Sequence, residues 1–217
     1  MSVTRGMFIT IEGGEGVGKS TNIAYIADQL SDANITCIVT REPGGTPLAE
    51  DIRQLLLSDR DEAIADNTEL LLMFASRAQH IAGVIEPALA RGDWVICDRF
   101  TDATYAYQGG GRGLSEAKIA NLEQWVQEDL RPDITILFDA PITVGMSRAG
   151  QRGKLDRIER ERAAFFENVR NCYLMLAERH SDRFRTVDAS ETLGRVQASL
   201  QPIIAEMKHQ FLVRSKT

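Results

Sequence analysis

The chain has 217 residues, of which 43% are hydrophobic and 26% are charged, and its formal net charge at pH 7 is -6. This length and composition are typical of one globular domain, and the acidic balance argues against nucleic acid or anionic membranes as partners. The N-terminus lacks a signal pattern and no run approaches the roughly 18 apolar residues of a membrane span, so we expect a cytoplasmic protein. Cys37, Cys97 and Cys172 lack metal-ligand spacing, and we interpret them as small buried thiols.

Short apolar runs alternate with longer segments of helical period, which predicts an α/β fold with a parallel sheet covered by helices. The predicted strands cover residues 8–12, 35–40, 94–97, 134–139 and 184–187. The predicted helices cover about residues 19–30, 48–57, 68–90, 115–128, 142–149, 157–180 and 191–210. No repeat or long linker divides the chain, so we expect residues 1–217 to form a single domain that binds ligands at the carboxyl ends of its strands.

The stretch FITIEGGEGVGKST, residues 8–21, contains Gly-x-x-x-x-Gly-Lys-Ser where a predicted strand gives way to a predicted helix. Glycines let successive backbone N–H groups face phosphate oxygens, and the helix N-terminus adds partial positive charge. We expect Lys19 to reach the β- and γ-phosphates of a nucleoside triphosphate and the Ser20 hydroxyl to bind Mg²⁺. A tight strand-to-helix turn without a ligand is the structural alternative. The predicted phosphate-binding residues are Gly13, Gly14, Glu15, Gly16, Val17, Gly18, Lys19, Ser20, Thr21 and, from the later arginine-rich segment, Arg148.

A phosphate loop alone is shared by kinases, nucleotide-driven switches and assembly ATPases. The chain has no Asn-Lys-x-Asp guanine signature and is too short to add a large motor apparatus to a complete core. It does carry TREPGGT at residues 40–46, DRF at residues 98–100 and an arginine-rich segment at residues 148–162, after its second, third and fourth predicted strands. Cations at several strand ends indicate a second phosphorylated substrate.

At these motifs the chain resembles the thymidylate kinase family nearly end to end. The matching pieces, in order, are IEGGEGVGKST, TREPGGT, FASRAQH, DRF, YAYQGGGRG and GKLDRIE. The resemblance implies a three-layer fold of the P-loop NTPase type with a five-stranded parallel core, Mg²⁺-dependent transfer of the γ-phosphate of ATP to dTMP, and a homodimer. A kinase for another nucleoside monophosphate or for a deoxynucleoside is the alternative among enzymes, and a regulatory ATPase is the alternative from another class.

The transfer chemistry depends on positioning and charge neutralisation, because a phosphate acceptor needs little help from a general base. Arg99 follows the third predicted strand, and its planar fork can hold phosphate oxygens in two directions. The family's Asp-Arg pair implies that Asp98 orients this arginine or helps arrange the water shell of Mg²⁺. A structural ion pair at the surface is the alternative for both residues.

Around REPGGT, the resemblance implies that Glu42 and Pro43 lie beside the sugar and phosphate of the acceptor. It also implies that Arg53, in the following helix, contacts the acceptor phosphate. An ordinary turn at a helix N-terminus explains Pro43 and the two glycines without any function.

Residues 148–162 carry a local charge of +3, which a solvated helix face would also explain. The resemblance places a mobile lid at about residues 148–157, where closure would exclude water and bring in cations. Because the phosphate loop holds Glu15 and no arginine, the chain matches the family subtype whose catalytic arginine lies in the lid. Arg152 is the first candidate and Arg148 the second. The predicted catalytic residues are Lys19, Asp98, Arg99 and Arg152.

The base is expected to lie against Arg77, which only donates hydrogen bonds and so suits the O4 acceptor of thymine rather than the N4 amine of cytosine. Thr104 and Gln108 are expected to supply the mixed donors and acceptors around N3. These three residues lie on predicted helix 68–90 and in the segment TYAYQGG.

Met73 stands where many relatives carry an aromatic residue that stacks on the base, so either Met73 or Phe74 is expected to cover the thymine. Core packing is the alternative for both. Tyr105, which we count among the dTMP-binding residues, or Tyr107 is expected to exclude a ribose 2′-hydroxyl. The histidines His80, His180 and His209 have no metal-ligand spacing and are interpreted as surface or helix residues.

Overall fold

The computed structural model describes residues 4–150 and 156–214, and the described chain contains one parallel sheet with the strand order β2-β3-β1-β4-β5. The strands are β1 (Phe8–Gly13), β2 (Cys37–Arg41), β3 (Trp94–Asp98), β4 (Ile134–Asp139) and β5 (Phe184–Asp188). All five predicted strands are confirmed, with boundaries that differ by at most two residues. No helix in the described part of the chain is long and apolar enough to cross a membrane.

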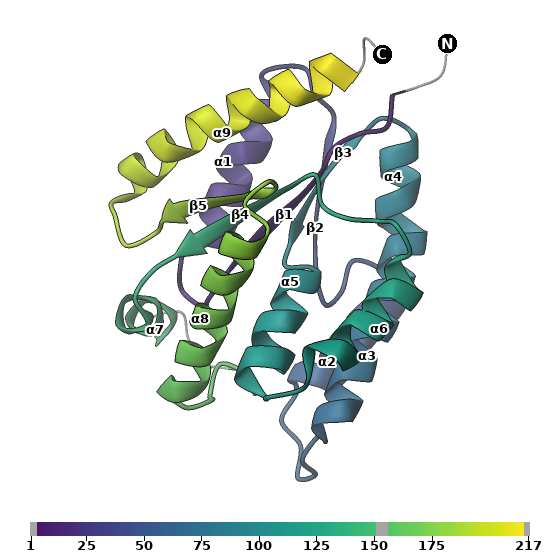
Figure 1. Cartoon of the computed structure of the whole chain (residues 1–217), viewed down its shortest axis with the longest axis vertical. Helices are drawn as coiled ribbons and strands as arrows, with labels where there is room; N and C mark the ends of the chain where they lie inside the picture. The colour runs from purple at the N-terminus through teal and green to yellow at the C-terminus, as the bar shows by residue number, and fades with distance from the viewer. Residues whose placement is uncertain (1–3, 151–155, 215–217) are drawn as a thin grey trace.

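Helices cover both faces of the sheet and make three layers (Figure 1). One face carries α1 (Lys19–Ser31) and α9 (Leu193–Arg214). The elements on the opposite side are α2 (Pro47–Leu57), α3 (Asp66–His80), η1 (Ile81–Ile85), α4 (Glu86–Ala90), α5 (Thr101–Thr104), η2 (Tyr105–Gly111), α6 (Glu116–Gln127) and α8 (Ala163–Arg179). The short helix α7 (Ile142–Gly150) follows the carboxyl end of β4.

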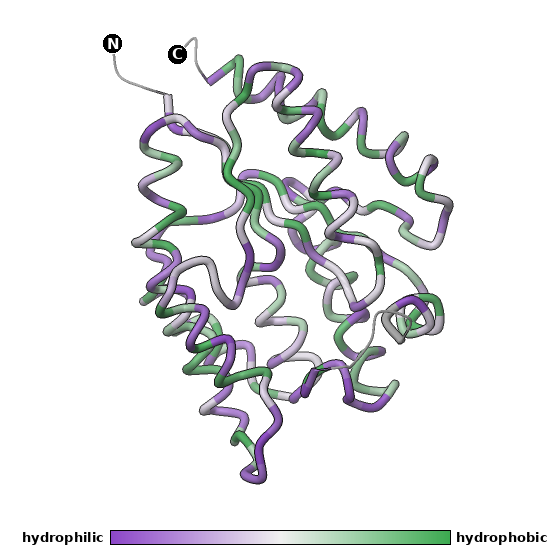
Figure 2. The backbone as a smooth tube through the Cα atoms, turned by 180° about the vertical axis from the view of Figure 1, so that it is seen from behind, coloured by the Kyte–Doolittle hydropathy of each residue, from purple (hydrophilic) through white to green (hydrophobic). Residues whose placement is uncertain are grey.

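The strands are apolar along most of their length because both faces of the sheet are covered. Every residue of β1 is buried, and Figure 2 shows the hydrophobic strands at the centre of the molecule. Ile9 and Ile11 pack against α1 and α9, whereas Phe8 packs against the opposite layer. The core therefore holds the central strands in place from both sides.

The strand register brings the loops after β1, β2 and β3 to one edge of the sheet. Ile11 of β1 and Arg41 of β2 both pair with Asp98 at the end of β3. Gly13 begins the phosphate loop with φ of 136°, and a Cβ atom there would lie 2.3 Å from the carbonyl oxygen of Phe138. Glycine is therefore required where this loop leaves the sheet.

Two helical predictions were wrong. The predicted helix 157–180 begins only at Ala163, because residues 156–162 form turns in which the Asp156 carboxylate accepts hydrogen bonds from the amides of Ile158 and Glu159. Residues 101–111 were not predicted as helical, yet they form α5 and η2. The glycines of η2 serve packing instead of a turn, since a Cβ atom on Gly110 would lie 2.9 Å from the carbonyl oxygen of Asn168 on α8.

Candidate active site

A cavity of about 260 Å³ opens at the edge of the sheet where β1, β2 and β3 end. Residues from the phosphate loop, from the two following strand ends and from α3 and η2 line it together. Of the predicted site residues, the cavity brings together Glu15, Gly16, Val17, Gly18, Lys19, Ser20, Glu42, Pro43, Arg53, Met73, Arg77, Asp98, Arg99, Thr104 and Gln108. Residues far apart in the chain thus share one enclosure.

The phosphate loop forms one end of this cavity. Gly16 and Gly18 have positive φ angles of 70° and 84°, and α1 begins immediately afterwards at Lys19. The Lys19 ammonium donates to the carbonyl oxygens of Gly13 at 3.2 Å and Gly14 at 2.9 Å. Burial, followed by the positive charge of Arg99, lowers the pKa of Lys19 from its ordinary value. An added anion is therefore favoured at this end, because it restores a charge partner to a desolvated ammonium.

Arg99 joins the phosphate loop to the rest of the site. Its backbone has a φ of 69°, and its Nη1 donates to the carbonyl oxygen of Gly13 at 3.1 Å. Its Nη2 forms an ion pair with Glu15 of the same loop, and the ring of Tyr107 lies 4.7 Å from the guanidinium carbon. The guanidinium is thus held between the loop and the acceptor side of the cavity, which suits a group that bridges two phosphates.

Asp98 has a buried Oδ1 atom that no described residue contacts by hydrogen bond. The described contacts include no hydrogen bond from Arg99 to Asp98, so they do not support the expectation that Asp98 orients this arginine. Ser20, whose side chain carries a hydroxyl group, is exposed and lines the same cavity as Asp98. A carboxylate oxygen without a donor and a hydroxyl in one cavity are suitable ligands for a cation that keeps most of its bound waters. Among the described residues, no group of three or more His, Cys, Asp or Glu side chains forms a metal cluster.

The acceptor side begins at the Glu42–Pro43 peptide bond, which is cis. Arg53 of α2 donates from Nη1 to the carbonyl oxygen of Pro43 at 2.9 Å, and it also borders the cavity. Burial, followed by the positive charge of Arg41, lowers the pKa of Arg53 from its ordinary value. Two neighbouring cations at one end of the cavity favour a phosphate between them.

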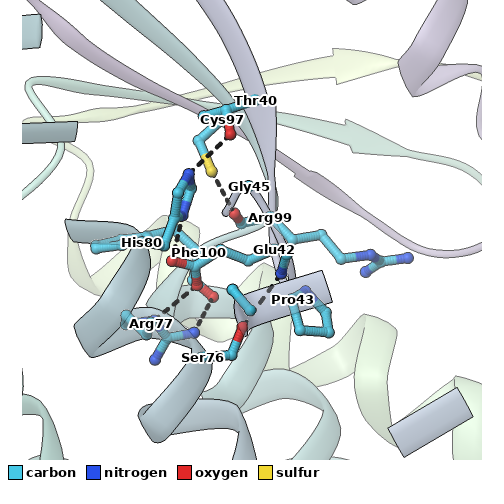
Figure 3. A network of polar contacts seen from close by, with 12 residues as sticks. Thr40, Glu42, Pro43, Gly45, Ser76, Arg77, His80, Cys97, Arg99 and Phe100 are labelled. Atoms are coloured by element: carbon cyan, nitrogen blue, oxygen red, sulfur yellow. Dashed lines mark hydrogen bonds and ion pairs between the residues drawn. The ribbon is translucent and has the colours of Figure 1, made fainter. Parts of the chain in front are cut away.

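Arg77 lies at the far end of the cavity with only 2% of its surface exposed. Its Nε donates to Glu42 at 2.7 Å (Figure 3). Its Nη2 donates to the carbonyl oxygen of Phe100 at 3.1 Å and to Thr104 at 2.9 Å. The remaining nitrogen, Nη1, has no partner among the described residues. This arrangement leaves one buried donor of a fixed guanidinium without a partner among the described residues, on a side chain that borders the cavity.

Gln108 is oriented by a residue that the sequence analysis missed. Its Nε2 donates to Glu69 at 2.9 Å, and Arg157 forms an ion pair with the same carboxylate. Burial raises the pKa of Glu69, but the hydrogen bonds from Gln108 and Arg157, together with the charge and hydrogen bond of Arg112, lower this pKa below its ordinary value. Because an ionised carboxylate only accepts, it selects the amide nitrogen of Gln108 and leaves the Gln108 carbonyl oxygen as an acceptor.

The structure separates two pairs of alternatives. Met73 lines the cavity, whereas Phe74 packs with Leu70 and Ile119 beneath the Arg77 guanidinium and does not line it. Tyr107 lines the cavity and its hydroxyl donates to Glu15 at 3.0 Å. Phe74 and Tyr105 do not line the cavity, so their described contacts do not support their assignment as dTMP-binding residues; the Tyr105 hydroxyl donates to Glu123 on α6 at 2.6 Å.

The two arginines predicted for the lid, Arg148 and Arg152, differ in whether the structure describes them. Arg148 lies near the end of α7 and donates from Nη1 to the carbonyl oxygen of Ala189 at 2.8 Å, after β5, so it does not line the cavity. Its assignment to phosphate binding is therefore not supported by its described contacts. Arg152 and the rest of residues 151–155 lie outside the described residues.

His80 was interpreted as a surface or helix residue; it lies in α3 but is fully buried. Together with Glu69, Ser76 and Arg77 it makes a buried polar face on α3. The spacing of these residues is helical, and it was the signal that could have identified them in the sequence. Glu12, the charged residue of the buried strand β1, was a similar signal.

The family model described as thymidylate kinase matches residues 11–200. The thymidylate kinase of Pseudomonas syringae pv. tomato is 60% identical over 202 residues, which cover 93% of this chain and 96% of that protein. The thymidylate kinase of Alcanivorax borkumensis is 59% identical over 203 residues, which cover 94% and 98%.

A solved structure of thymidylate kinase from Ehrlichia chaffeensis superimposes with a TM-score of 0.76 at 31% identity and covers 92% of this chain and 99% of that one. The five-stranded parallel sheet flanked by helices is therefore the P-loop NTPase fold of these enzymes, as predicted. On the family match and the identity to both curated relatives, the chain belongs to the thymidylate kinase family and is a kinase.

Proposed function

We propose that this site transfers the γ-phosphate of ATP to dTMP, with Mg²⁺, to form dTDP. Family membership makes the chain a kinase of dTDP synthesis. One observation carries the assignment of the site: the phosphate loop and the pocket around Arg77 are two ends of a single cavity. A triphosphate and a nucleoside monophosphate bound at these ends would meet at Arg99.

The donor end works through backbone amides and Lys19. The amides of the loop bind the β- and γ-phosphates, and the Lys19 ammonium exchanges its carbonyl partners for phosphate oxygens. Ser20 and, through water, Asp98 would hold Mg²⁺, which neutralises the charge of the triphosphate when bound. Arg99 then reduces the repulsion between the two phosphates, and Arg152 in the lid is assigned the remaining cation, with Arg148 as its second candidate.

The acceptor end fixes the monophosphate and the base. Arg53, near Glu42 and Pro43, is assigned to the dTMP phosphate. Arg77 Nη1 donates to thymine O4, and the Gln108 carbonyl oxygen accepts from N3–H. Cytosine presents an amine at position 4 and an unprotonated N3, so it reverses both interactions and is rejected.

Two side chains in the cavity are assigned to recognition of the shape of the substrate. The Met73 thioether covers the base face, because it lies in the cavity beside Arg77. Tyr107 excludes the ribose 2′-hydroxyl, since its hydroxyl is held by Glu15. Tyr107 and Met73 both lie within the cavity that contains Arg99.

A coupled assay of ADP release tests this function, with dTMP, dUMP, dCMP, UMP and thymidine as acceptors. We expect release to require Mg²⁺ and to be fastest with dTMP. Thymidine separates the monophosphate kinase from a deoxynucleoside kinase, because only the latter phosphorylates it. If none of the acceptors changed the rate of ATP hydrolysis, the protein would behave as a regulatory ATPase, and this result would contradict the proposal.

We also propose a single nucleoside monophosphate kinase domain over residues 1–217 with its lid at about 148–157, a homodimer, and a cytoplasmic location. Exposed apolar side chains on α2, α3 and α6 support the dimer, because α3 packs against both other helices. They are Leu48, Leu55, Leu71 and Trp125. Light scattering of the wild type and of Leu71→Glu tests this part, and an unchanged molar mass in the variant would argue against this surface.

A further inference from the structure

His80 and Glu42 form a buried network behind the base end of the cavity (Figure 3). The His80 Nδ1 atom lies 3.1 Å from Glu42 Oε1, and its Nε2 atom lies 2.7 Å from the hydroxyl oxygen of Thr40. The other carboxylate oxygen of Glu42, Oε2, accepts from Arg77 Nε at 2.7 Å. Each oxygen of Glu42 thus has its own donor, one from Arg77 and one from the ring.

The backbone after β2 leaves room for this ring. Gly45 has a φ of 90°, and a Cβ atom there would lie 2.4 Å from the His80 ring and 2.8 Å from the Thr40 hydroxyl oxygen. Any larger residue would displace the ring from Glu42. The second glycine of REPGGT therefore has a packing reason that a simple helix-start turn does not require.

The donor pattern fixes which ring nitrogen carries the proton. The Glu42 carboxylate pairs with Arg77 and only accepts hydrogen bonds, so Nδ1 of His80 must donate to it. In the neutral ring, Nε2 then accepts from the Thr40 hydroxyl. The hydrogen bonds therefore share one donor-to-acceptor direction: Thr40 donates to His80, and His80 donates to Glu42.

Glu42 and two aromatic rings hold the guanidinium of Arg77. The Phe74 and Phe100 rings lie 4.8 Å and 5.0 Å from its central carbon. These contacts restrict tilting, whereas the Glu42 bond to Nε and the Nη2 bonds to Phe100 and Thr104 together set the rotation within the guanidinium plane, which decides where Nη1 points. Of these three partners, Glu42 is the charged one, so a Glu42 carboxylate that turned would remove the ion pair from this set.

We propose that His80 is a positioning residue for base recognition, which fixes the Glu42 carboxylate so that Arg77 directs Nη1 at the substituent on position 4 of the pyrimidine. The inference rests on the proposed function and deepens it. His80 does not line the cavity, so it acts only through Glu42 and Arg77.

Two substitutions separate the contacts of the ring. In His80→Asn, the amide nitrogen replaces Nδ1 and keeps the bond to Glu42, whereas in His80→Gln it replaces Nε2 and keeps only the contact with Thr40. Both variants lack the ring and share its packing loss. We expect His80→Asn to keep the dTMP to dCMP ratio of kcat/KM within about 3-fold, and His80→Gln to reduce it about 10-fold by raising KM for dTMP.

Thr40→Val is the matched control, because it removes the hydroxyl on the other side of the ring and is expected to keep the base preference. KM for ATP should stay within about 2-fold in all three variants, since the phosphate end is untouched. A purely structural role predicts equal thermal destabilisation of His80→Asn and His80→Gln without any difference in base preference. That result, or an unchanged preference in both, would overturn the proposal.

Wild-type measurements keep the test decisive. If the wild type shows no dTMP-dependent ADP release, the proposed function fails whatever the variants do; if it is active and His80→Gln keeps its preference, only the role of His80 fails. Should neither variant fold, nitrogen NMR of histidine-labelled wild-type protein decides. The proposal requires a proton on Nδ1 of His80, and a ring protonated on Nε2 alone would exclude it.

Discussion

The phosphate end of the cavity presents mostly backbone, whereas the base end presents buried side chains. At the phosphate end, glycine angles and the start of α1 place the amides, and the Lys19 ammonium donates to two carbonyl oxygens of its own loop. At the base end, Arg77 depends on Glu42, Phe100 and Thr104, which come from two other segments of the chain. Substitutions at the first end should therefore change turnover, and substitutions at the second should change both specificity and stability.

Lys19→Ala should have the largest effect on turnover, because Lys19 is assigned to charge that develops on the transferred phosphate. We expect kcat to fall about 100-fold to 1000-fold. The dissociation constant for dTMP, measured by calorimetry, should stay within about 3-fold, because no base contact is removed. A large loss of dTMP affinity would show that the two ends of the cavity are not separable in this way.

Arg77→Ala should remove the donor to O4 and cost roughly 1.5–3 kcal/mol in transition-state binding, or about 10-fold to 150-fold in kcat/KM for dTMP. The dTMP to dCMP preference should shrink at least as much. The substitution should also weaken folding, because removal of Arg77 leaves the buried Glu42 carboxylate without its cation.

We therefore expect the melting temperature of Arg77→Ala to fall as well, by an amount equivalent to about 3 kcal/mol. Lys19→Ala is the control, since the hydrogen bonds of Lys19 to described residues go to loop carbonyls and its removal strands no buried carboxylate partner. A wild-type melting temperature for Arg77→Ala together with an unchanged base preference would place base recognition elsewhere.

The contrast between the two ends of the cavity also explains which parts of the fold and of the site the sequence predicts. The strands, the phosphate loop and Arg99 follow from local patterns, because short apolar runs, glycines and one strand end determine them. Helical spacing could mark Glu69 and His80 as one polar face of a helix, but their partners Gln108 and Glu42 lie about forty positions away, and no local pattern contains those contacts. Likewise, the glycine-rich composition of η2 resembles that of a loop. Its helical structure depends on close packing of these glycines against α8, which the local sequence does not reveal.

Gly145→Ala tests whether the phosphate loop depends on a single distant support. A Cβ atom at Gly145 of α7 would lie 2.4 Å from the carbonyl oxygen of Glu15, so either the helix or the loop must move. We expect kcat to fall roughly 10-fold with KM for dTMP nearly unchanged, because only the phosphate end is displaced. Gly194→Ala on α9 is the control, since nothing lies within 4 Å of its Cβ position. Equal values of kcat and KM in both variants would contradict the dependence of the phosphate loop on Gly145.

Glu12→Gln should have the smallest effect on turnover and should sharpen the comparison through stability. Glu12 lies beneath the phosphate loop, where its oxygens accept from the Phe100 amide at 2.7 Å and the Tyr173 hydroxyl at 2.8 Å. Burial, followed by the charge of Asp102, raises the pKa of Glu12 to about 7 from 4.5. The folded protein therefore keeps a proton on Glu12 at pH values where the unfolded chain has already lost it.

This difference has a definite sign. As the pH rises from about 4.5 to about 7, the contribution of Glu12 to stability falls, and above that range it stays constant. The substituted amide does not ionise, so Glu12→Gln should be more stable than the wild type at about pH 8, by about 1 to 3 kcal/mol, and the difference should vanish near pH 4.5. Denaturant titrations of both proteins across this range provide the measurement, and kcat should change only a few-fold because the amide can still hold Phe100 and Tyr173. Stability curves that run parallel from acid to alkaline pH would contradict this prediction, because they would mean that Glu12 has the same pKa in the folded and the unfolded chain.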